Sequence, residues 1–229
     1  MIDLSTWNLT LPVGVPAVTI ETPQLAGGYQ DHYFQAKNGA IFFWAPVNGS
    51  TTRHSEYPRS ELRESQTDGD PYNWKYPEAE HVLDATLQVT QMPSSGDISL
   101  GQVHSAKGSR PPLMLRFQYD ASSGLGDLMV AFREKPSHED SDWVVLLADV
   151  RLNQSFSYRI TLSPSGDLMV QARAPDGSLR KWQDRLDRAW ASYPLYFKAG
   201  VYTMDNKGNE SEAGAATFSA LKVRHRDAP

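Results

Sequence analysis

The chain has 229 residues, of which 40% are hydrophobic and 21% charged, enough apolar material for one large globular domain or two small ones. Its formal net charge of −5 argues against a surface built to hold nucleic acid. The absence of cysteine excludes disulfides, thiolate metal sites and a cysteine nucleophile.

The chain shows no sign of a membrane segment or a secretory signal. No stretch approaches 18 consecutive apolar residues, so we expect no membrane partner. The opening MIDLSTWNLTLPVG lacks a basic region followed by a long apolar stretch. A Met start without a signal predicts a cytoplasmic protein, whereas removal of a signal before this Met would place it in the periplasm or outside the cell. We also expect a monomer.

Apolar and polar residues alternate with a period of two along several short segments. This alternation predicts half-buried antiparallel strands, because successive side chains of a strand point to opposite faces. The segments are residues 82–90, 113–120, 128–133, 156–162 and 168–172. SPSGD, residues 163–167, has the composition of a hairpin turn. Only QDRLDRAWA, residues 183–191, predicts a short helical turn.

Many short strands separated by turns, without a linker-like change in composition, predict an all-β fold. We expect a single domain over residues 1–229, folded as a β-jelly roll sandwich of two antiparallel sheets. Sheets of this kind curve, and their concave face can hold an extended polymer in a cleft.

The segment RSELRE, residues 59–64, has three charges on one face of a predicted strand. Alternation places Arg59, Glu61 and Arg63 together and the other three residues on the opposite face. A carboxylate between two guanidiniums is either a structural ion-pair ladder or a cationic platform for an anionic ligand. Taken alone, the structural interpretation is favoured, because ion pairs on solvated faces are common and contribute little.

Two later segments also have a polar and an apolar face. GQVH, residues 101–104, places Gln102 and His104 opposite Val103. In YFKAGVY, residues 196–202, the polar face consists of Tyr196, Lys198, Gly200 and Tyr202. A glycine there would leave room above the backbone for a ligand. If the three segments are neighbours in one sheet, their polar faces form one site.

Each of these residues has a structural explanation on its own. A lone strand histidine is more often satisfied structure than a catalyst, and a tyrosine at a sheet rim is more often simply amphipathic. The combination, however, suits removal of a proton from a carbon beside a carboxylate. Arg and Gln neutralise the carboxylate, His is a base near neutral pH, and Tyr can donate or accept a proton where cations lower its pKa.

Removal of such a proton builds negative charge on the carboxylate oxygens, and donors fixed around them stabilise the transition state. In a uronic acid polymer this charge then expels the glycosidic oxygen at C4. The chain is cleaved by β-elimination, without water.

RSELRE, QVH and YFKAGVY, in this order, resemble the three sequence signatures of alginate lyases of polysaccharide lyase family 7. WNLTLPVG also resembles the start of their catalytic domain, and the resemblance covers residues 3–225. It implies a jelly roll whose concave cleft binds alginate. It further implies that Arg59 and Gln102 neutralise the uronate carboxylate, that His104 is a base, and that Tyr202 is the acid that protonates the leaving oxygen.

The resemblance also implies substrate-binding and support residues around these four: Glu61, Arg63, Asn73, Tyr196 and Lys198. Asn73 lies in the PYNW element after the first signature. Family members frequently have a polar residue near position 204, where this chain has Met204. The resemblance therefore does not say which contacts this chain makes at an outer subsite.

The resemblance carries an expectation about substrate preference. Its QVH form tends to accompany activity on mannuronate-rich substrate, so we expect mannuronate to be slightly favoured. Separately, we expect endolytic cleavage. Syn elimination from mannuronate would use Tyr202 as both base and acid. Anti elimination from guluronate would use His104 as the base and Tyr202 as the acid.

Two other functions fit a similar sandwich. A glycoside hydrolase needs two carboxylates flanking the scissile bond; the candidates are Glu61, Glu64, Glu78 and Glu80. A non-catalytic carbohydrate-binding module would use exposed aromatics, with Trp74, Trp143 and Trp182 as candidates. The six histidines show no paired ligand spacing, so we expect no metal and no cofactor.

Overall fold

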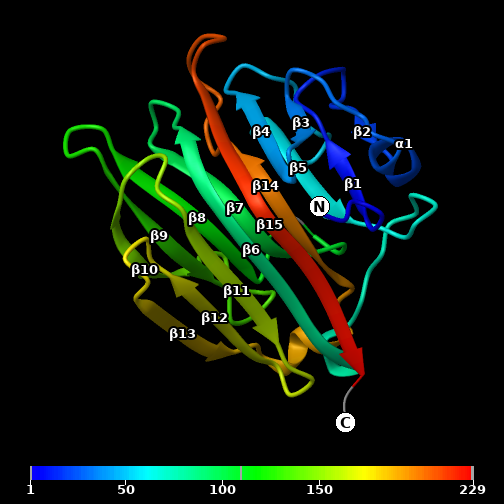
Figure 1. Ribbon diagram of the computed structural model, residues 1–229. Coiled ribbons are helices and arrows are strands. Elements are labelled where there is room, and N and C mark those ends of the chain that lie inside the picture. Colours follow the sequence, from blue (N-terminus) through cyan, green and yellow to red (C-terminus); the bar gives the residue numbers. More distant parts are fainter. Residues whose placement is uncertain (1, 109, 228–229) are drawn as a thin grey trace.

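The computed structural model describes residues 2–108 and 110–227; residues 1, 109, 228 and 229 of the predicted domain lie outside it. The described residues form a sandwich of two antiparallel sheets, which confirms the predicted all-β jelly roll (Figure 1). In Figure 1, β15 and β6 of one sheet cross in front of β14 and β7 of the other.

Within the described residues, one sheet has eight strands and the other seven. In spatial order, the eight-stranded sheet consists of β10 (Asp142–Val150), β9 (Leu125–Phe132), β8 (Leu113–Asp120), β7 (Asp97–Ser105), β14 (Leu195–Tyr202), β5 (Arg59–Glu64), β1 (Trp7–Thr10) and β2 (Thr19–Ile20). The seven-stranded sheet consists of β13 (Leu179–Arg185), β12 (Asp167–Arg173), β11 (Phe156–Leu162), β6 (Ala79–Gln91), β15 (Ala213–Asp227), β4 (Ala40–Pro46) and β3 (Phe34–Lys37).

Four of the five segments with alternating apolar residues lie within strands of these sheets, and the fifth, residues 128–133, runs one residue past the end of β9 at Phe132. Two of them, residues 113–120 and 156–162, coincide with β8 and β11. The hairpin turn after β11 also forms, with the amide of Gly166 donating to the carbonyl of Ser163 at 2.9 Å. Alternation therefore predicts these strands well, because one face of each strand is buried in the core.

Helical segments are few and short, and the sequence predicts them poorly. The helical turn expected at 183–191 is wrong in its first half: residues 183–185 belong to β13, and the 3-10 helix η2 (Arg188–Ser192) follows, capped by Asp187. The short helices α1 (Thr22–Ala26) and η1 (Tyr76–Glu78) have too few residues to show a period. No described helix is long and apolar enough to span a membrane.

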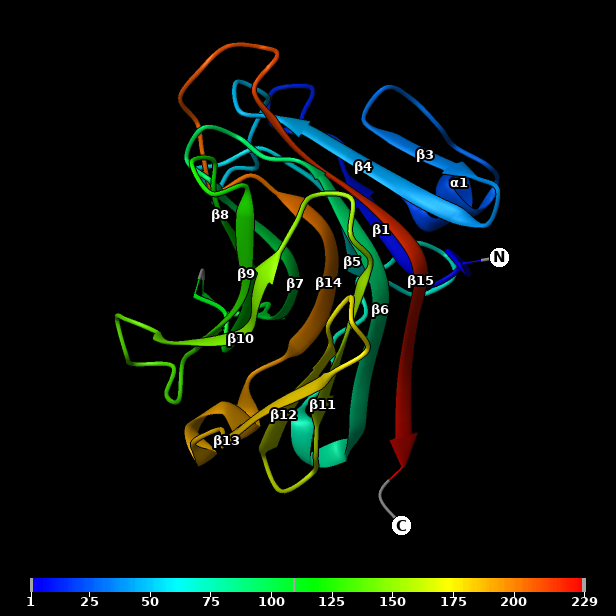
Figure 2. The ribbon, with the colours of Figure 1, turned by 60° about the vertical axis from the view of Figure 1, so that its left-hand side comes forward.

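The inner faces of the two sheets form the core. Leu62, Val103 and Phe197, one from each signature strand, are fully buried there. Burial of a side chain of this size contributes about 1.5–3 kcal/mol. Since side chains alternate along a strand, packing these residues inward turns their polar neighbours to the outer side of the eight-stranded sheet. Figure 2 shows the curved course of β7 and β14, which lie side by side.

Candidate active site

The three signature strands are neighbours in the order β7, β14, β5. Lys198 of β14 pairs with Gln102 of β7 on one side and with Arg63 of β5 on the other. Tyr202 pairs with Arg59 in the same ladder. Paired residues point to the same side of a sheet, so the polar faces of the three segments join into one surface. We call this side of the eight-stranded sheet the cleft face.

The cleft face holds a cavity of about 540 Å³. Seven of the residues singled out in the sequence line it: Arg59, Arg63, Gln102, His104, Tyr196, Lys198 and Tyr202. Among the described lining residues there is no Asp or Glu. The cavity is therefore cationic, although the whole chain has a formal net charge of −5.

Glu61 lies fully buried beneath this surface and organises it. Its Oε2 accepts from Arg59 Nη1 at 2.9 Å and contacts Lys198 Nζ at 2.6 Å, while its Oε1 accepts from Gln102 Nε2 at 2.6 Å. Burial opposes ionisation of Glu61, but Lys198 and Arg59 together lower its pKa. Glu61 thus fixes three donors beneath the cleft. It is fully buried and is not among the cleft-lining residues, so its expected substrate-binding role stays a prediction.

Arg63 is held at the edge of the cleft by contacts on both sides. Its Nη2 donates to Asn73 Oδ1 at 2.5 Å and its Nη1 to the carbonyl of Tyr72 at 3.1 Å. Its guanidinium lies 4.0 Å from the ring centroid of Tyr196. Asn73 is exposed and is not among the cleft-lining residues, so the contact that the structure shows for it is with Arg63.

The hydrogen bonds of His104 determine which ring nitrogen can act as a base. Burial, followed by the charge of Lys198, lowers the pKa of His104 to about 4, so the ring is neutral at neutral pH. Its Nδ1 lies 2.9 Å from the carbonyl of Ser105. A carbonyl only accepts, so we assign the proton to Nδ1, which leaves the Nε2 lone pair free to accept a proton.

Tyr202 is also neutral at neutral pH, but in its protonated form. Burial raises its pKa, and the Arg59 guanidinium, 3.9 Å from the ring centroid, opposes this only in part. The charge of Arg59 lowers the pKa, as expected of a cation, but desolvation outweighs it and the net shift is upward. At neutral pH the site pairs a neutral imidazole with a protonated phenol, one base and one acid.

The site geometry agrees with the comparison with known proteins. The family model for alginate lyases matches residues 2–225. The chain belongs to the alginate lyases of polysaccharide lyase family 7. It is therefore a polysaccharide lyase, as the three signatures predict.

Individual relatives match this lyase over nearly its whole length. An alginate lyase of Klebsiella pneumoniae is 26% identical over 276 residues, covering 97% of this chain and 89% of the relative. The crystal structure of an alginate lyase of Pseudomonas aeruginosa has a TM-score of 0.91 at 44% identity, covering 98% and 100% of the two chains. Alginate lyase A1-II', a member of polysaccharide lyase family 7, has a TM-score of 0.84 at 29% identity, covering 99% and 97%.

Gly200 was expected to leave room for a ligand, but the structure gives another reason for a glycine at this position. Its φ is +142°, and a Cβ there would lie 2.7 Å from the carbonyl oxygen of Ser60 and 2.8 Å from Cα of Glu61. Glycine is therefore required by the close approach of β5, at a register irregularity between β14 and β7. The structure gives no indication that it makes room for a ligand.

The sequence patterns missed other residues of the site. Glu64, on the reverse side of β5, accepts from Trp74 Nε1 at 2.8 Å and from the Phe197 amide at 2.6 Å. Thr52, His54 and Ser55 line the cleft from the loop before β5. A loop has no periodicity that reveals which of its side chains face a cleft.

The C-terminal side of the third signature also reaches the cleft. Met204 is one of the lining residues, and its φ of +48° lies in the left-handed region, which is uncommon for residues other than glycine. The departure from the family pattern at Met204 therefore falls on the cleft itself.

The described part of the cleft lacks the pair of carboxylates that a glycoside hydrolase needs. Of the four candidate carboxylates, Glu61 and Glu64 are buried and committed to internal partners. Glu78 accepts from the amide of Lys75, and Glu80 lies 3.8 Å from Arg226. Since no carboxylate lines the cleft among the described residues, two carboxylates cannot flank a bond there.

The tryptophans do not form the exposed platform of a binding module. Trp74 is 3% exposed and stacks on His81, with ring centroids 3.9 Å apart. Trp182 is half-buried and packs edge-on against Phe132. Trp143 alone among the three candidates is largely exposed.

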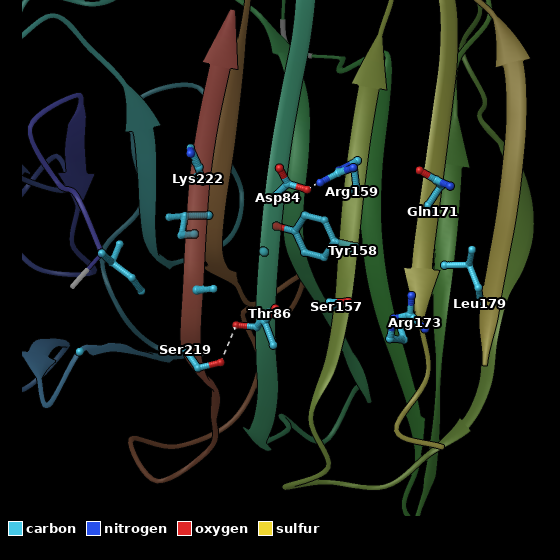
Figure 3. A pocket seen from close by; sticks show the side chains of 15 residues that line it. Asp84, Thr86, Ser157, Tyr158, Arg159, Gln171, Arg173, Leu179, Ser219 and Lys222 are labelled. Atoms are coloured by element: carbon cyan, nitrogen blue, oxygen red, sulfur yellow. Dashed lines mark hydrogen bonds and ion pairs between the residues drawn. The ribbon is translucent and has the colours of Figure 1, made fainter. Parts of the chain in front are cut away.

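A second hollow, of about 630 Å³, lies on the seven-stranded sheet (Figure 3). Its one described carboxylate, Asp84, pairs with Arg159 and Arg224. Its tyrosine, Tyr158, donates to the carbonyl of Leu100 in the core. With no histidine among its described lining residues, this hollow lacks the base and acid that the cleft contains.

Proposed function

We propose that this lyase binds alginate in the cleft and cleaves it by β-elimination between C4 and C5. One observation carries the proposal: Arg59, Gln102 and Lys198, all held by Glu61, lie beside a neutral His104 and a protonated Tyr202. Structures of A1-II' in complex with substrate GGMG and with product GGG support alginate as the ligand class.

The roles of the residues follow from their protonation states. Arg59 and Gln102 hold the uronate carboxylate, so that charge developing on its oxygens is stabilised as the C5–H bond breaks. His104 Nε2 takes the C5 proton in anti elimination. The C4–O4 bond breaks as the C4=C5 double bond forms, and Tyr202 donates its proton to O4. The product carries an unsaturated uronate at its new non-reducing end.

Endolytic cleavage is part of the proposal. The lining residues come from β1 and β2 on one side of the signature strands and from Met114 of β8 on the other. The cleft thus extends in both directions from Tyr202, and a polymer can continue past the reacting sugar at both ends.

We further propose a slight preference for mannuronate-rich alginate, on the basis of the QVH signature. Val103 itself is fully buried in the core and makes no direct contact with a substrate in the cleft. The resting protonation states favour the anti route for guluronate, because Tyr202 must first lose its proton to act as the base of the syn route. The ratio of the cleavage rates on polymannuronate and polyguluronate shows whether the QVH signature or the resting protonation states predict the preference.

The test is ultraviolet absorbance during incubation with polymannuronate and polyguluronate separately, without added metal. We expect absorbance to rise with both polymers, since elimination creates a double bond conjugated to the carboxylate, and somewhat faster with polymannuronate. Release of saturated ends without a rise in absorbance would contradict elimination. A faster rise with polyguluronate would refute the mannuronate preference alone.

A further inference from the structure

The cleft face continues beyond the cavity to the edge strand β10. Gln102 of β7 pairs with Met114 of β8, Met114 pairs with Ala131 of β9, and Ala131 pairs with Trp143 of β10. Paired residues point to the same side of a sheet, and Met114 lines the cleft. One row of side chains therefore leads from Gln102 to Trp143 on the cleft face.

Trp143 is 45% exposed, which is unusual for so large an aromatic side chain. Val145, two residues later on the same side of β10, is 50% exposed. The described residues thus leave a contiguous apolar surface uncovered at the outer end of the cleft face. An exposed aromatic ring of this kind can pack against the apolar face of a sugar.

Arg116 of β8 supplies a fixed cation beside this ring. Its guanidinium lies 5.2 Å from the ring centroid of Trp143, which confirms that both side chains lie on the same face. Its Nε and Nη2 both donate to the carboxylate of Asp97, at 2.7 Å for Nε. This bidentate contact fixes the guanidinium plane. No hydrogen bond from Nη1 to another described residue is present, and 12% of the side chain is exposed.

We propose that Trp143 and Arg116 form a distal subsite that binds one uronate residue of the polymer. The ring would take the apolar face of the sugar and Arg116 its carboxylate. Three strand spacings separate β7 from β10, roughly 14 Å in all, so the subsite lies about three sugar residues from Gln102. The inference rests on the proposed function, because it extends the same cleft.

The subsite makes a prediction that depends on substrate length. Trp143→Ala should raise KM on polymeric alginate by about twofold to tenfold, if stacking on a sugar is comparable to an aromatic pair, which contributes about 0.5–1.5 kcal/mol. Cleavage of a trisaccharide, too short to reach β10 from Tyr202, should keep its kcat/KM. Trp143→Phe should restore most of the loss, since it keeps an aromatic face. Leu179→Ala, at an exposed apolar residue of β13, is the matched control.

Three results would overturn the subsite. One is an unchanged KM of Trp143→Ala on the polymer, and another is an equal loss on polymer and trisaccharide, which would mean that Trp143 only supports the fold. The third is a dimer in solution that Trp143→Ala dissociates, because a second copy would then be the occupant of this surface.

A second measurement separates this inference from the proposed function. Electrophoresis in gels containing alginate needs no turnover and compares Tyr202→Phe with Tyr202→Phe/Trp143→Ala. We expect the double variant to be retarded less. Equal retardation would overturn the subsite even in an active lyase, whereas a failure of the wild type to raise ultraviolet absorbance would count against the proposed elimination alone.

Discussion

At the residue scale, the chemistry depends on two side chains whose pKa values are shifted apart by a shared environment. Burial lowers the pKa of His104 to about 4 and raises that of Tyr202. Each shift favours the neutral form, because desolvation disfavours charge. The pair therefore enters the reaction as base and acid without prior proton transfer.

This arrangement predicts a broad pH range for activity. His104 gains a proton only as the pH falls toward its pKa of about 4, so kcat/KM on polyguluronate should stay nearly constant from pH 7 down to about 5. On the alkaline side, burial and the charge of Arg59 lower the pKa of Lys198 to about 8. Loss of that proton removes a cation from the carboxylate site, so kcat/KM should decline above about pH 8.

The pH–rate profile of kcat/KM in a constant-ionic-strength buffer series checks this. Constant ionic strength matters because the attraction between a cationic cleft and a polyanion is screened by salt. An acid limb near pH 6.5, the usual pKa of histidine, would show that His104 is not held neutral by burial.

At this scale, sequence patterns identified which residues share the cleft face, but not the ion pairs beneath it or the directions of the pKa shifts. Alternation alone places Arg59, Gln102, His104 and Tyr202 on one side of their strands. It does not show that Glu61 lies beneath them or that burial outweighs the neighbouring cations at Tyr202, because both depend on packing from other strands.

At the scale of elements, Glu64 joins the strands of the site from behind. Besides Trp74 and the Phe197 amide, it accepts from His225 Nε2 of β15 at 2.7 Å. The other ring nitrogen of His225 lies 2.7 Å from His81 Nδ1 of β6. The network thus links β5 and β14 of the eight-stranded sheet to β6 and β15 of the other sheet.

His225→Ala should therefore reduce stability by about 1–3 kcal/mol, because it leaves one oxygen of the buried Glu64 carboxylate without its partner. Urea unfolding measures this as a lower midpoint with an unchanged slope. His138→Ala, at an exposed histidine, is the control and should stay within about 0.5 kcal/mol of the wild type. Equal midpoints for the two variants would show that the network contributes nothing to stability.

Alternation predicts the strands of the core because one face of each strand is buried. It fails at β13, whose residues are mostly exposed, and there QDRLDRAWA imitates a helical pattern. What defines β13 is its pairing with β12, for example Arg185 with Asp167. Such a pairing partner cannot be read from local sequence.

At the scale of the whole molecule, curvature and charge distribution adapt a sandwich to a polyanion. The chain is acidic overall, yet no described residue that lines the cleft is acidic. Net charge therefore excludes a uniformly basic surface without excluding a basic cleft. The three signatures predicted the family and the position of the cleft, whereas the loop and edge residues around it required the structure.

The measurement that tests the account most directly is the turnover of Tyr202→Phe on polymannuronate and polyguluronate. The substitution removes one hydroxyl, and Tyr57→Phe, whose ring lies 5.8 Å from that of Tyr202, is the matched control. We predict that Tyr202→Phe loses at least about a thousandfold in kcat while it still binds alginate and unfolds at the wild-type midpoint, because the leaving oxygen has no acid. A kcat near that of the wild type would contradict the proposed proton transfer.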